Sequence, residues 1–231
     1  MPGVVAAIVK SLDDPNALGR VQVQFDWMSD APEGYWARVA APMAGADRGC
    51  FFMPEVNDEV LVAFDHGDVA HPYVIGYCWS GPDKPPFDAN LEKRGIRTVA
   101  GSELIFDDNA GGSPTIVLTT KGGFKVSLDE AGAKINIVTG GGVTVELDDV
   151  PPQVQVTLPT GNSLTLGPLG LDVNVAAGTL SVTAMDVTIT APSVTIDAAM
   201  TSVSGVLNVA GPVIANGIVS PTYTPGAGNI W

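Results

Sequence analysis

The second half of this 231-residue chain lacks aromatic side chains. Between Phe124 and Tyr223 there is no Phe, Trp or Tyr, whereas the part up to Phe87 is rich in all three. Aromatic residues are the large pieces of a globular core. A long segment without them must have a core too narrow to hold a ring, or no core of its own.

Charge also disappears along the chain. After Val150 the only charged side chains are Asp172, Asp186 and Asp197, and residues 198–231 carry none. On insertion scales, a charge at the centre of a bilayer costs about 2.5–3.5 kcal/mol. The composition of this end therefore favours an object that passes through an apolar layer. A narrow structural stalk is the alternative interpretation.

Positive charge is scarce throughout. The chain has 11 Lys and Arg against 25 Asp and Glu, a net charge of −14. Because nucleic-acid affinity comes mostly from cationic side chains that neutralise phosphates, we expect no nucleic-acid partner. No run approaches the roughly 18 apolar residues of a spanning helix. The first residues, MPGVVAAIVKSLDD, lack the basic flank of a signal peptide, so none is expected.

Residues suited to metal or covalent chemistry are few. Cys50 and Cys78 do not have a metal-ligand spacing, and either one disulfide or two buried free thiols fits the sequence. His66 and His71 lie in and after the stretch DHGD, where they could suggest a metal or acid–base cluster. We interpret DHGD as a hairpin turn in which Gly67 takes a positive φ.

The remaining tempting sites also have a structural interpretation. Adjacent residues on a strand point to opposite faces, so the pairs Asp107–Asp108 and Asp148–Asp149 are poorly placed to cooperate as catalytic carboxylates. We expect them to end strands. A phosphate loop requires a Lys and a helix after its glycines, and neither follows Gly140–Gly142. The sequence predicts no catalytic residue, no metal site and no cofactor, and therefore not an enzyme.

The first part of the chain predicts a small β-barrel. Short stretches of alternating apolar and polar residues are separated by Asp, Pro and Gly, a pattern typical of barrels and sandwiches. The expected strands are VVAAIV near the N-terminus, VQVQF from Val21, YWARV from Tyr35, EVLVAF from Glu59 and YVIGYCW from Tyr73. The stretch SGPDKPPF from Ser80 predicts an extended linker.

From about Ser102 the chain repeats one kind of strand. Val, Ile or Leu alternates with Thr, Ser, Asp or Lys, and the centres lie roughly ten residues apart at first and nearer seven at the end. The segments are ELIF, TIVLT, FKVSL, KINIV, VTVEL, VQVTL, SLTL, LDVNV, LSVT, VTI, VTI and VLNV.

Repeats this short cannot close a core within one chain. A single-chain β-helix needs roughly 20 residues or more for each turn. Three chains that wind together, each supplying one wall of each layer, need far fewer. The repeat length therefore predicts a homotrimer around a slim aliphatic column.

The barrel sequence resembles a known family. NALGRVQVQFDW, YWARVAAPMAG and GCFFMPEVNDEVLVAFDHGDVAHPYVIGYCWSG resemble the barrel of contractile-tail central spikes, the phage baseplate assembly protein V and VgrG proteins. GSELIFDDNAGG resembles the start of the family's β-helix. The resemblance covers nearly the whole chain, most specifically residues 18–80 and 102–118.

The resemblance implies an all-β fold: an OB-type barrel at 1–80, a linker at 81–101, an intertwined triple-stranded β-helix needle at 102–220 and a tip cap at 221–231, assembled as a homotrimer. It implies a spike in the baseplate of a virion or injection particle, assembled in the bacterial cytoplasm, that pierces the target envelope when the sheath contracts. The expected partners are a tail hub protein at the barrel end, a PAAR-type tip protein at the other, and transiently the target membrane.

The sequence departs from the family pattern in three respects. VgrG proteins carry hub domains ahead of the barrel, whereas this sequence starts at the barrel, so we expect the hub to be a separate protein. The stretch from Ser80 to Ser102 is too short for the lysozyme of some phage spikes, and no His-x-His pair could hold iron at the tip. The residues expected to dock a tip protein are Pro221, Tyr223, Pro225 and Trp231, since Trp and Tyr favour interfaces.

Two other classes of function were weighed. A trimeric β-helical tail fibre or adhesin that binds carbohydrate would need exposed rings or paired carboxylates along the rod, and residues 125–222 contain no ring. A nucleic-acid-binding barrel would need a basic, aromatic groove, but acidic residues outnumber basic ones in the barrel. The spike is the leading hypothesis, and the adhesin is its alternative.

Overall fold

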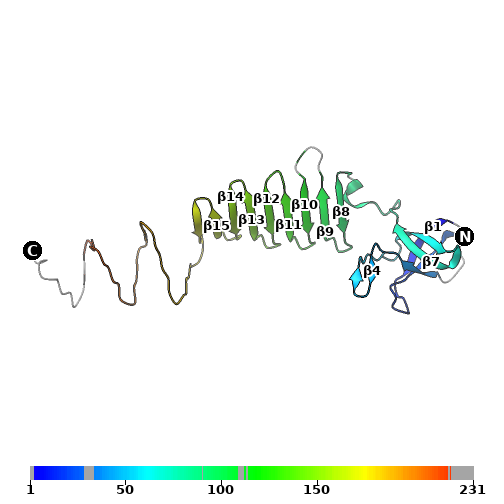
Figure 1. Cartoon of the computed structure of the whole chain (residues 1–231), viewed down its shortest axis with the longest axis horizontal. Coiled ribbons are helices and arrows are strands. Elements are labelled where there is room, and N and C mark those ends of the chain that lie inside the picture. The colour runs from blue at the N-terminus through cyan, green and yellow to red at the C-terminus, as the bar shows by residue number, and fades with distance from the viewer. Residues whose placement is uncertain are drawn as a thin grey trace, which may run out of the picture. The chain divides into compact units, whose positions relative to one another are not determined.

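The computed structural model describes residues 3–28, 34–89, 91–108, 112, 114–217 and 219. Apart from two short 3₁₀ turns, all regular structure in these residues is β, so the all-β prediction is confirmed. No helix in the described part of the chain is long and apolar enough to cross a membrane. The chain consists of a closed barrel, a nine-stranded sheet and a long segment without strands, shown in Figure 1.

Five strands close the N-terminal barrel, as the sequence predicts. Their order around the barrel is β1-β2-β3-β7-β6, with β1 pairing β6 to complete the circle and β3 parallel to β7. A five-stranded barrel of this kind is an OB-type fold. The strands are β1 (Val4–Ser11), β2 (Val21–Gln24), β3 (Tyr35–Val39), β6 (Glu59–Asp65) and β7 (Asp68–Tyr77).

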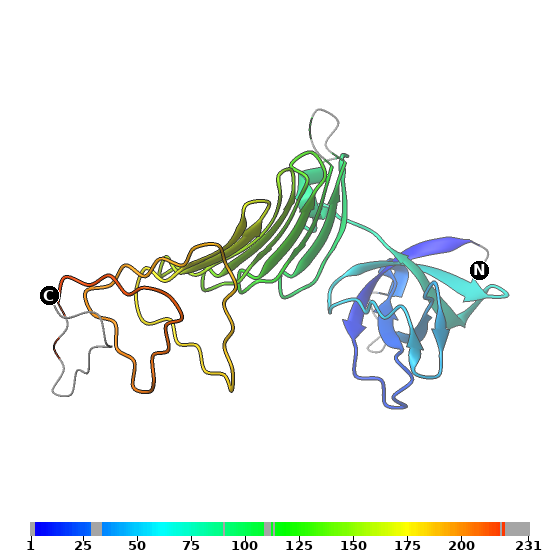
Figure 2. The ribbon, with the colours of Figure 1, turned by 60° about the vertical axis from the view of Figure 1, so that its left-hand side comes forward.

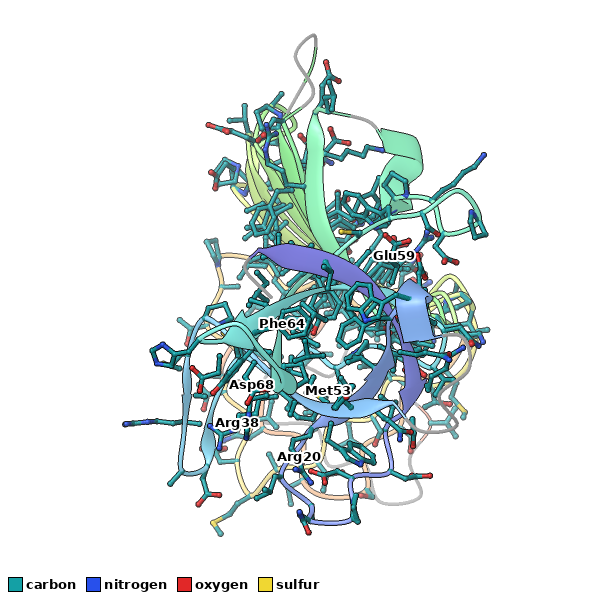
Figure 3. All side chains as sticks on the ribbon, turned by 90° about the vertical axis from the view of Figure 1, so that its right-hand side faces the viewer. Arg20, Arg38, Met53, Glu59, Phe64 and Asp68 are labelled. Carbon is teal, nitrogen blue, oxygen red and sulfur yellow. The ribbon has the colours of Figure 1, made fainter. Side chains whose placement is uncertain are left out.

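The barrel contains its own apolar core. Alternate residues of each strand point inward, so β2 has the burial pattern buried, partly buried, buried, partly buried along VQVQ. Phe25 is fully buried and contacts the rings of Trp27, Tyr35 and Phe64. Met53 and Phe64 lie on the inner side of the barrel wall (Figure 3). The remaining buried residues are Ala7, Val9, Val21, Val23, Ala37, Val60, Val62 and Val74.

An ion pair closes the loop between β1 and β2. The Arg20 guanidinium donates to both carboxylate oxygens of Asp14, at 2.7 Å for the shortest contact, and lies over the ring of Trp36. Asp14 also accepts the backbone N–H groups of Asn16, Leu18 and Arg20. The Arg20 guanidinium and these donors hold the pKa of the Asp14 carboxyl well below its usual range.

Short elements that the sequence prediction did not include lie between the barrel strands and in the linker after them. A two-stranded hairpin, β4 (Ala44–Gly45) with β5 (Arg48–Gly49), extends between β3 and β6. One 3₁₀ turn, η1 (Asp26–Met28), follows β2, and another, η2 (Pro86–Ala89), lies in the predicted linker.

A nine-stranded antiparallel sheet follows, with its strands side by side in sequence order (Figures 1 and 2). Eight of these strands coincide with the repeats predicted from ELIF to LDVNV. The ninth, β8, falls within the predicted linker. The strands are β8 (Lys93–Arg97), β9 (Glu103–Asp107), β10 (Thr115–Thr119), β11 (Lys125–Asp129), β12 (Lys134–Val138), β13 (Thr144–Asp149), β14 (Pro152–Thr157), β15 (Ser163–Gly167) and β16 (Gly170–Asn174).

The residues expected to punctuate the repeats do so. β9 ends at Asp107 and β13 at Asp149, so both acidic pairs lie at strand ends, as predicted. The stretch Gly140–Gly142 is the turn between β12 and β13, where Gly142 has a φ of 83°. A Cβ on Gly140 would lie 2.4 Å from the carbonyl oxygen of Gly122, so this turn can pack against its neighbour only with glycine there.

The last four predicted strands do not form within the chain. Residues 175–217 contain no strand, although they include LSVT, both VTI repeats and VLNV. Residues from Ser181 onward form a separate unit. A strand exists only if another strand accepts its backbone hydrogen bonds, and no described part of this chain does so here.

Candidate functional site: an apolar sheet face and the segment after it

The β8–β16 sheet presents two rows of aliphatic side chains on one face. In the first row Leu118 pairs with Leu104 on one side and Val126 on the other. The row as a whole consists of Ile96, Leu104, Leu118, Val126, Ile137, Val145, Val156, Leu164 and Val173. The second row lies two residues along each strand and therefore on the same face: Phe106, Ile116, Leu128, Ile135, Leu147, Val154, Leu166 and Leu171.

No part of the described chain covers this apolar face. Most of its side chains are 39–64% exposed, and Leu128, in the middle of the sheet, is 41% exposed. By contrast, the barrel buries residues of the same alternating pattern completely. Exposed apolar area of this extent is rare on a monomer and marks an interaction surface.

The opposite face of the sheet is mainly polar. Its central row is Ser127, Asn136, Glu146, Gln155 and Thr165, all partly buried by their neighbours. The Lys134 ammonium lies 2.9 Å from Glu146 Oε1 and 3.0 Å from Asp148 Oδ1, and these two carboxylates raise the pKa of Lys134. This face therefore suits contact with water, and the aliphatic face suits a core.

The chain leaves the sheet through a side-chain clamp. Asn162 donates through Nδ2 to the carbonyl oxygen of Ala177 at 3.2 Å and accepts the Ala177 N–H at Oδ1 at 3.1 Å. Between 178 and 217, the described residues make no recorded hydrogen bond. The backbone of this segment therefore has all its donors and acceptors free for strands of another chain.

The terminal segment nevertheless keeps a regular repeat. In the two VTI motifs, Val187 and Val194 are 59% and 57% exposed, and Ile189 and Ile196 are both 70% exposed. Positions seven residues apart thus occupy equivalent environments. The repeat is therefore regular, although it pairs with no described part of this chain.

The histidines form no site. His66 and Gly67 both have positive φ, at 48° and 81°, in the hairpin between β6 and β7, so the predicted turn is confirmed. His66 is 99% exposed beside Asp65, and His71 Nδ1 lies 2.9 Å from Asp68 Oδ2. Within the described residues, no group of three or more His, Cys, Asp or Glu side chains could hold a metal ion.

Both cysteines are free thiols, which excludes a disulfide between them, but both are exposed, so the burial expected for free thiols is wrong. The residues expected to dock a tip protein, Pro221, Tyr223, Pro225 and Trp231, lie outside the described residues. Their role stays a prediction.

Sequence reasoning missed β8 and the register of the sheet. β8, with the sequence KRGIR, has three basic residues in five and a glycine, so it lacks the aliphatic alternation used to find the other strands. The signal that it is an edge strand was this basic charge, because charged side chains are a common way to protect a sheet edge from further pairing.

Comparison with known proteins identifies the barrel. Residues 5–79 match the model of the type VI secretion system/phage-baseplate injector OB domain. The spike protein VgrG2a of Pseudomonas aeruginosa is 28% identical over 121 residues, which are 48% of this chain and 14% of that protein. The spike protein VgrG3 of Vibrio cholerae is 31% identical over 114 residues, or 45% of this chain and 11% of that protein.

One similar protein has a toxin activity in its name. The actin cross-linking toxin VgrG1 of Vibrio cholerae is 29% identical over 106 residues, but these residues are only 10% of that protein. This chain spans a small part of the length of each of these relatives, so their whole-protein activities are not transferred to it. The barrel, residues 5–79, therefore matches the injector OB domain, and this part of the chain is similar to VgrG spike proteins of type VI secretion systems.

Proposed function

We propose that this chain is the central spike of a contractile injection system, and that three copies form a needle that pierces the target envelope. The observation that carries the proposal is the uncovered apolar face of the β8–β16 sheet. The strands β10 to β16 each contribute two aliphatic side chains to a stripe that no other described part of the chain covers. Three such sheets can bury the stripe against one another.

The dimensions of the sheet fit a three-walled column. A five-residue strand is about 17 Å long. In a triangle with sides of that length, each wall lies about 5 Å from the axis, which is half of the ~10 Å between packed sheets. Full burial of an aliphatic side chain is worth about 1.5–3 kcal/mol. Since these side chains are roughly half exposed, assembly gains on the order of 1 kcal/mol from each.

The terminal segment continues the same column in a different way. Its seven-residue repeats are too short to pair within the chain, and their free backbone groups match those of two other copies. We propose that strands of the three chains alternate there. Separation of the chains then requires unfolding, which gives the needle its resistance to force.

The distribution of charge supports a role in piercing. On β14 and β15 the polar face has only Gln, Thr and Ser, and the described residues beyond β15 carry only Asp172, Asp186 and Asp197 as charged side chains. Few charges must therefore be desolvated as the needle passes through a membrane. The energy comes from sheath contraction, and the chain itself performs no catalysis.

The partners follow from this assignment. The barrel end joins a tail hub, and Pro221, Tyr223, Pro225 and Trp231 receive a PAAR-type tip protein. The spike resides in the baseplate of a virion or injection particle assembled in the bacterial cytoplasm.

Gold labelling of contractile particles with antibodies against the barrel tests the proposal. We expect a single label at the baseplate end of the tail, and loss of target-cell killing, with sheath contraction retained, when the apolar face is disrupted. Label along the fibres, or absence from the tail, would contradict it. The former result would favour the adhesin.

A further inference from the structure

Opposite edges of the sheet carry opposite charge. The strands β9, β11 and β13 all end on the same side of the sheet, in a row of turns that we call the acidic edge. The acidic residues of this row are Asp107, Asp108, Asp129, Glu130, Asp148 and Asp149. At the other edge, the turn KGGFK (121–125) joins β10 to β11, and we call it the basic turn. β11 connects the two, since it begins at Lys125 and ends at Asp129, next to Glu130. Figure 2 shows the strands running between these two rows of turns.

A groove of about 590 Å³ lies on the apolar face along the acidic edge. Its floor is aliphatic and includes Ile116, Leu128 and Ile135. Its rim includes the carboxylates of Glu130 and Asp149. The groove thus combines an apolar bottom with a negative border and is open to an occupant that has the inverse pattern.

The basic turn has that inverse pattern. Phe124 is 56% exposed and shares the parity of Val126 and Leu128, so it adds a ring to the apolar face just before β11 begins. Lys121 and Lys125 flank it in the sequence, and Lys125, the first residue of β11, has the parity of the polar face. The glycines of the turn add no bulk: a Cβ on Gly122 would lie 3.9 Å from the Phe124 ring.

The charges on the two sides are available to each other. Lys93 already pairs with Asp107, and Arg94 with Asp108, within the chain. Among the described residues, however, neither Lys121 nor Lys125 makes an ion pair. The carboxylates of Glu130 and Asp149 make none in the same part of the chain.

We propose that the basic turn of one copy docks into the groove at the acidic edge of the next, with the Phe124 ring on the aliphatic floor and Lys125 beside Glu130 and Asp149. This inference rests on the proposed trimer and specifies how its walls join. Contact between unlike edges is heterologous and generates a ring when the rotation closes. Two-fold pairing of like edges would instead place carboxylate against carboxylate, which is unfavourable.

Engineered disulfides test the contact directly. In a Cys50→Ser/Cys78→Ser background, Lys125→Cys is combined with Glu130→Cys, or with Asp149→Cys. Within one chain positions 125 and 130 lie about 17 Å apart along β11, far beyond the ~7 Å that a disulfide can span. We expect oxidation of at least one pair to give a covalent trimer on a boiled, non-reducing gel. Each single-cysteine variant should run as a monomer, whereas contact between like edges would cross-link it.

A charge swap gives a second, independent readout. Lys125→Glu should speed dissociation of the trimer at least tenfold, and the added Glu130→Lys should restore it. Lys84→Glu, a matched reversal in the linker, should have no effect. Phe124→Ala should also dissociate at least tenfold faster, but Trp79→Ala, which removes a ring that is even more exposed, just after β7, should not.

The outcomes separate this inference from the proposed function. If the unmodified chain is not a trimer by light scattering, the proposed function fails. If it is a trimer, but neither cysteine pair cross-links above its single-cysteine controls and Phe124→Ala behaves like Trp79→Ala, then the walls join elsewhere and only the edge contact is overturned.

Discussion

The barrel and the sheet use the same alternation of apolar and polar residues, with opposite results. In the barrel, β2 (VQVQ) buries both valines completely. In the sheet, β10 (TIVLT) leaves Ile116 39% and Leu118 49% exposed. The difference is closure: the barrel strands pair around a circle, whereas the sheet strands pair in a row. The same alternation therefore forms a buried core in the barrel and an uncovered apolar face in the sheet.

The segment after Ala177 extends this comparison by one step. Here the alternation remains, but even backbone pairing is absent among residues 178–217. The barrel strands pair and close, the sheet strands pair without closing, and residues 178–217 do neither. On this account, the dependence of folding on other copies rises steadily from the N-terminus towards the C-terminus.

The largest expected effect comes from a charge on the open face. Leu128→Asp should abolish trimer formation, because three carboxylates would be buried in one layer of the column without partners. Ser127→Asp is the matched control, since its side chain lies on the polar face one residue away. Light scattering should give monomer for the first variant and trimer for the second. A trimer of Leu128→Asp would show that this face is not the core.

Hydrogen exchange sharpens the contrast between sheet and segment. In the assembled protein, amides of residues 181–217 should be protected as strongly as those of β11, because other copies supply their acceptors. In Leu128→Asp they should exchange freely, while the barrel amides keep their protection. Free exchange of the segment in a wild-type trimer would mean that its repeats do not pair between chains.

A cavity in the barrel should affect only the barrel. Phe25→Ala removes a fully buried ring and should cost about 3–5 kcal/mol of barrel stability. Because the barrel core is formed by residues of one chain, calorimetry should show a lower melting temperature for the barrel, and light scattering should still give a trimer. Loss of the trimer in this variant would show that the two regions depend on each other.

The smallest effect concerns the Asp14–Arg20 loop. Because the pKa of Asp14 is lowered in the folded barrel, its stabilisation is present above the ordinary carboxyl pKa of about 3.9 and is lost as the pH falls toward the folded value. Asp14→Asn should therefore be less stable than the wild type at neutral pH, with a difference that narrows on acidification. Urea melts at pH 7 and pH 3 measure it, and a constant difference would contradict the assignment.

The sequence predicted those features that depend on local pattern. The five barrel strands, eight of the nine sheet strands and the turn at Gly67 all follow from alternation and punctuation. β8 was missed because its basic composition conceals the alternation.

Register was not predictable in the same way. The two apolar rows depend on which residues pair across each hairpin. That pairing is set by the type and length of each turn, which alternation alone does not specify. The opposite charges of the two edges became visible for the same reason, since Lys125 and Glu130 are five residues apart in sequence but lie on opposite sides of the sheet.

The mass of the native protein tests the central claim most directly. Light scattering, with an unboiled SDS gel beside it, should give about three times the chain mass of 23.8 kDa, with the assembly persisting in SDS. A mass equal to one chain would contradict the account. The apolar face would then have to be covered by a different protein, and a shared needle of three walls could not exist.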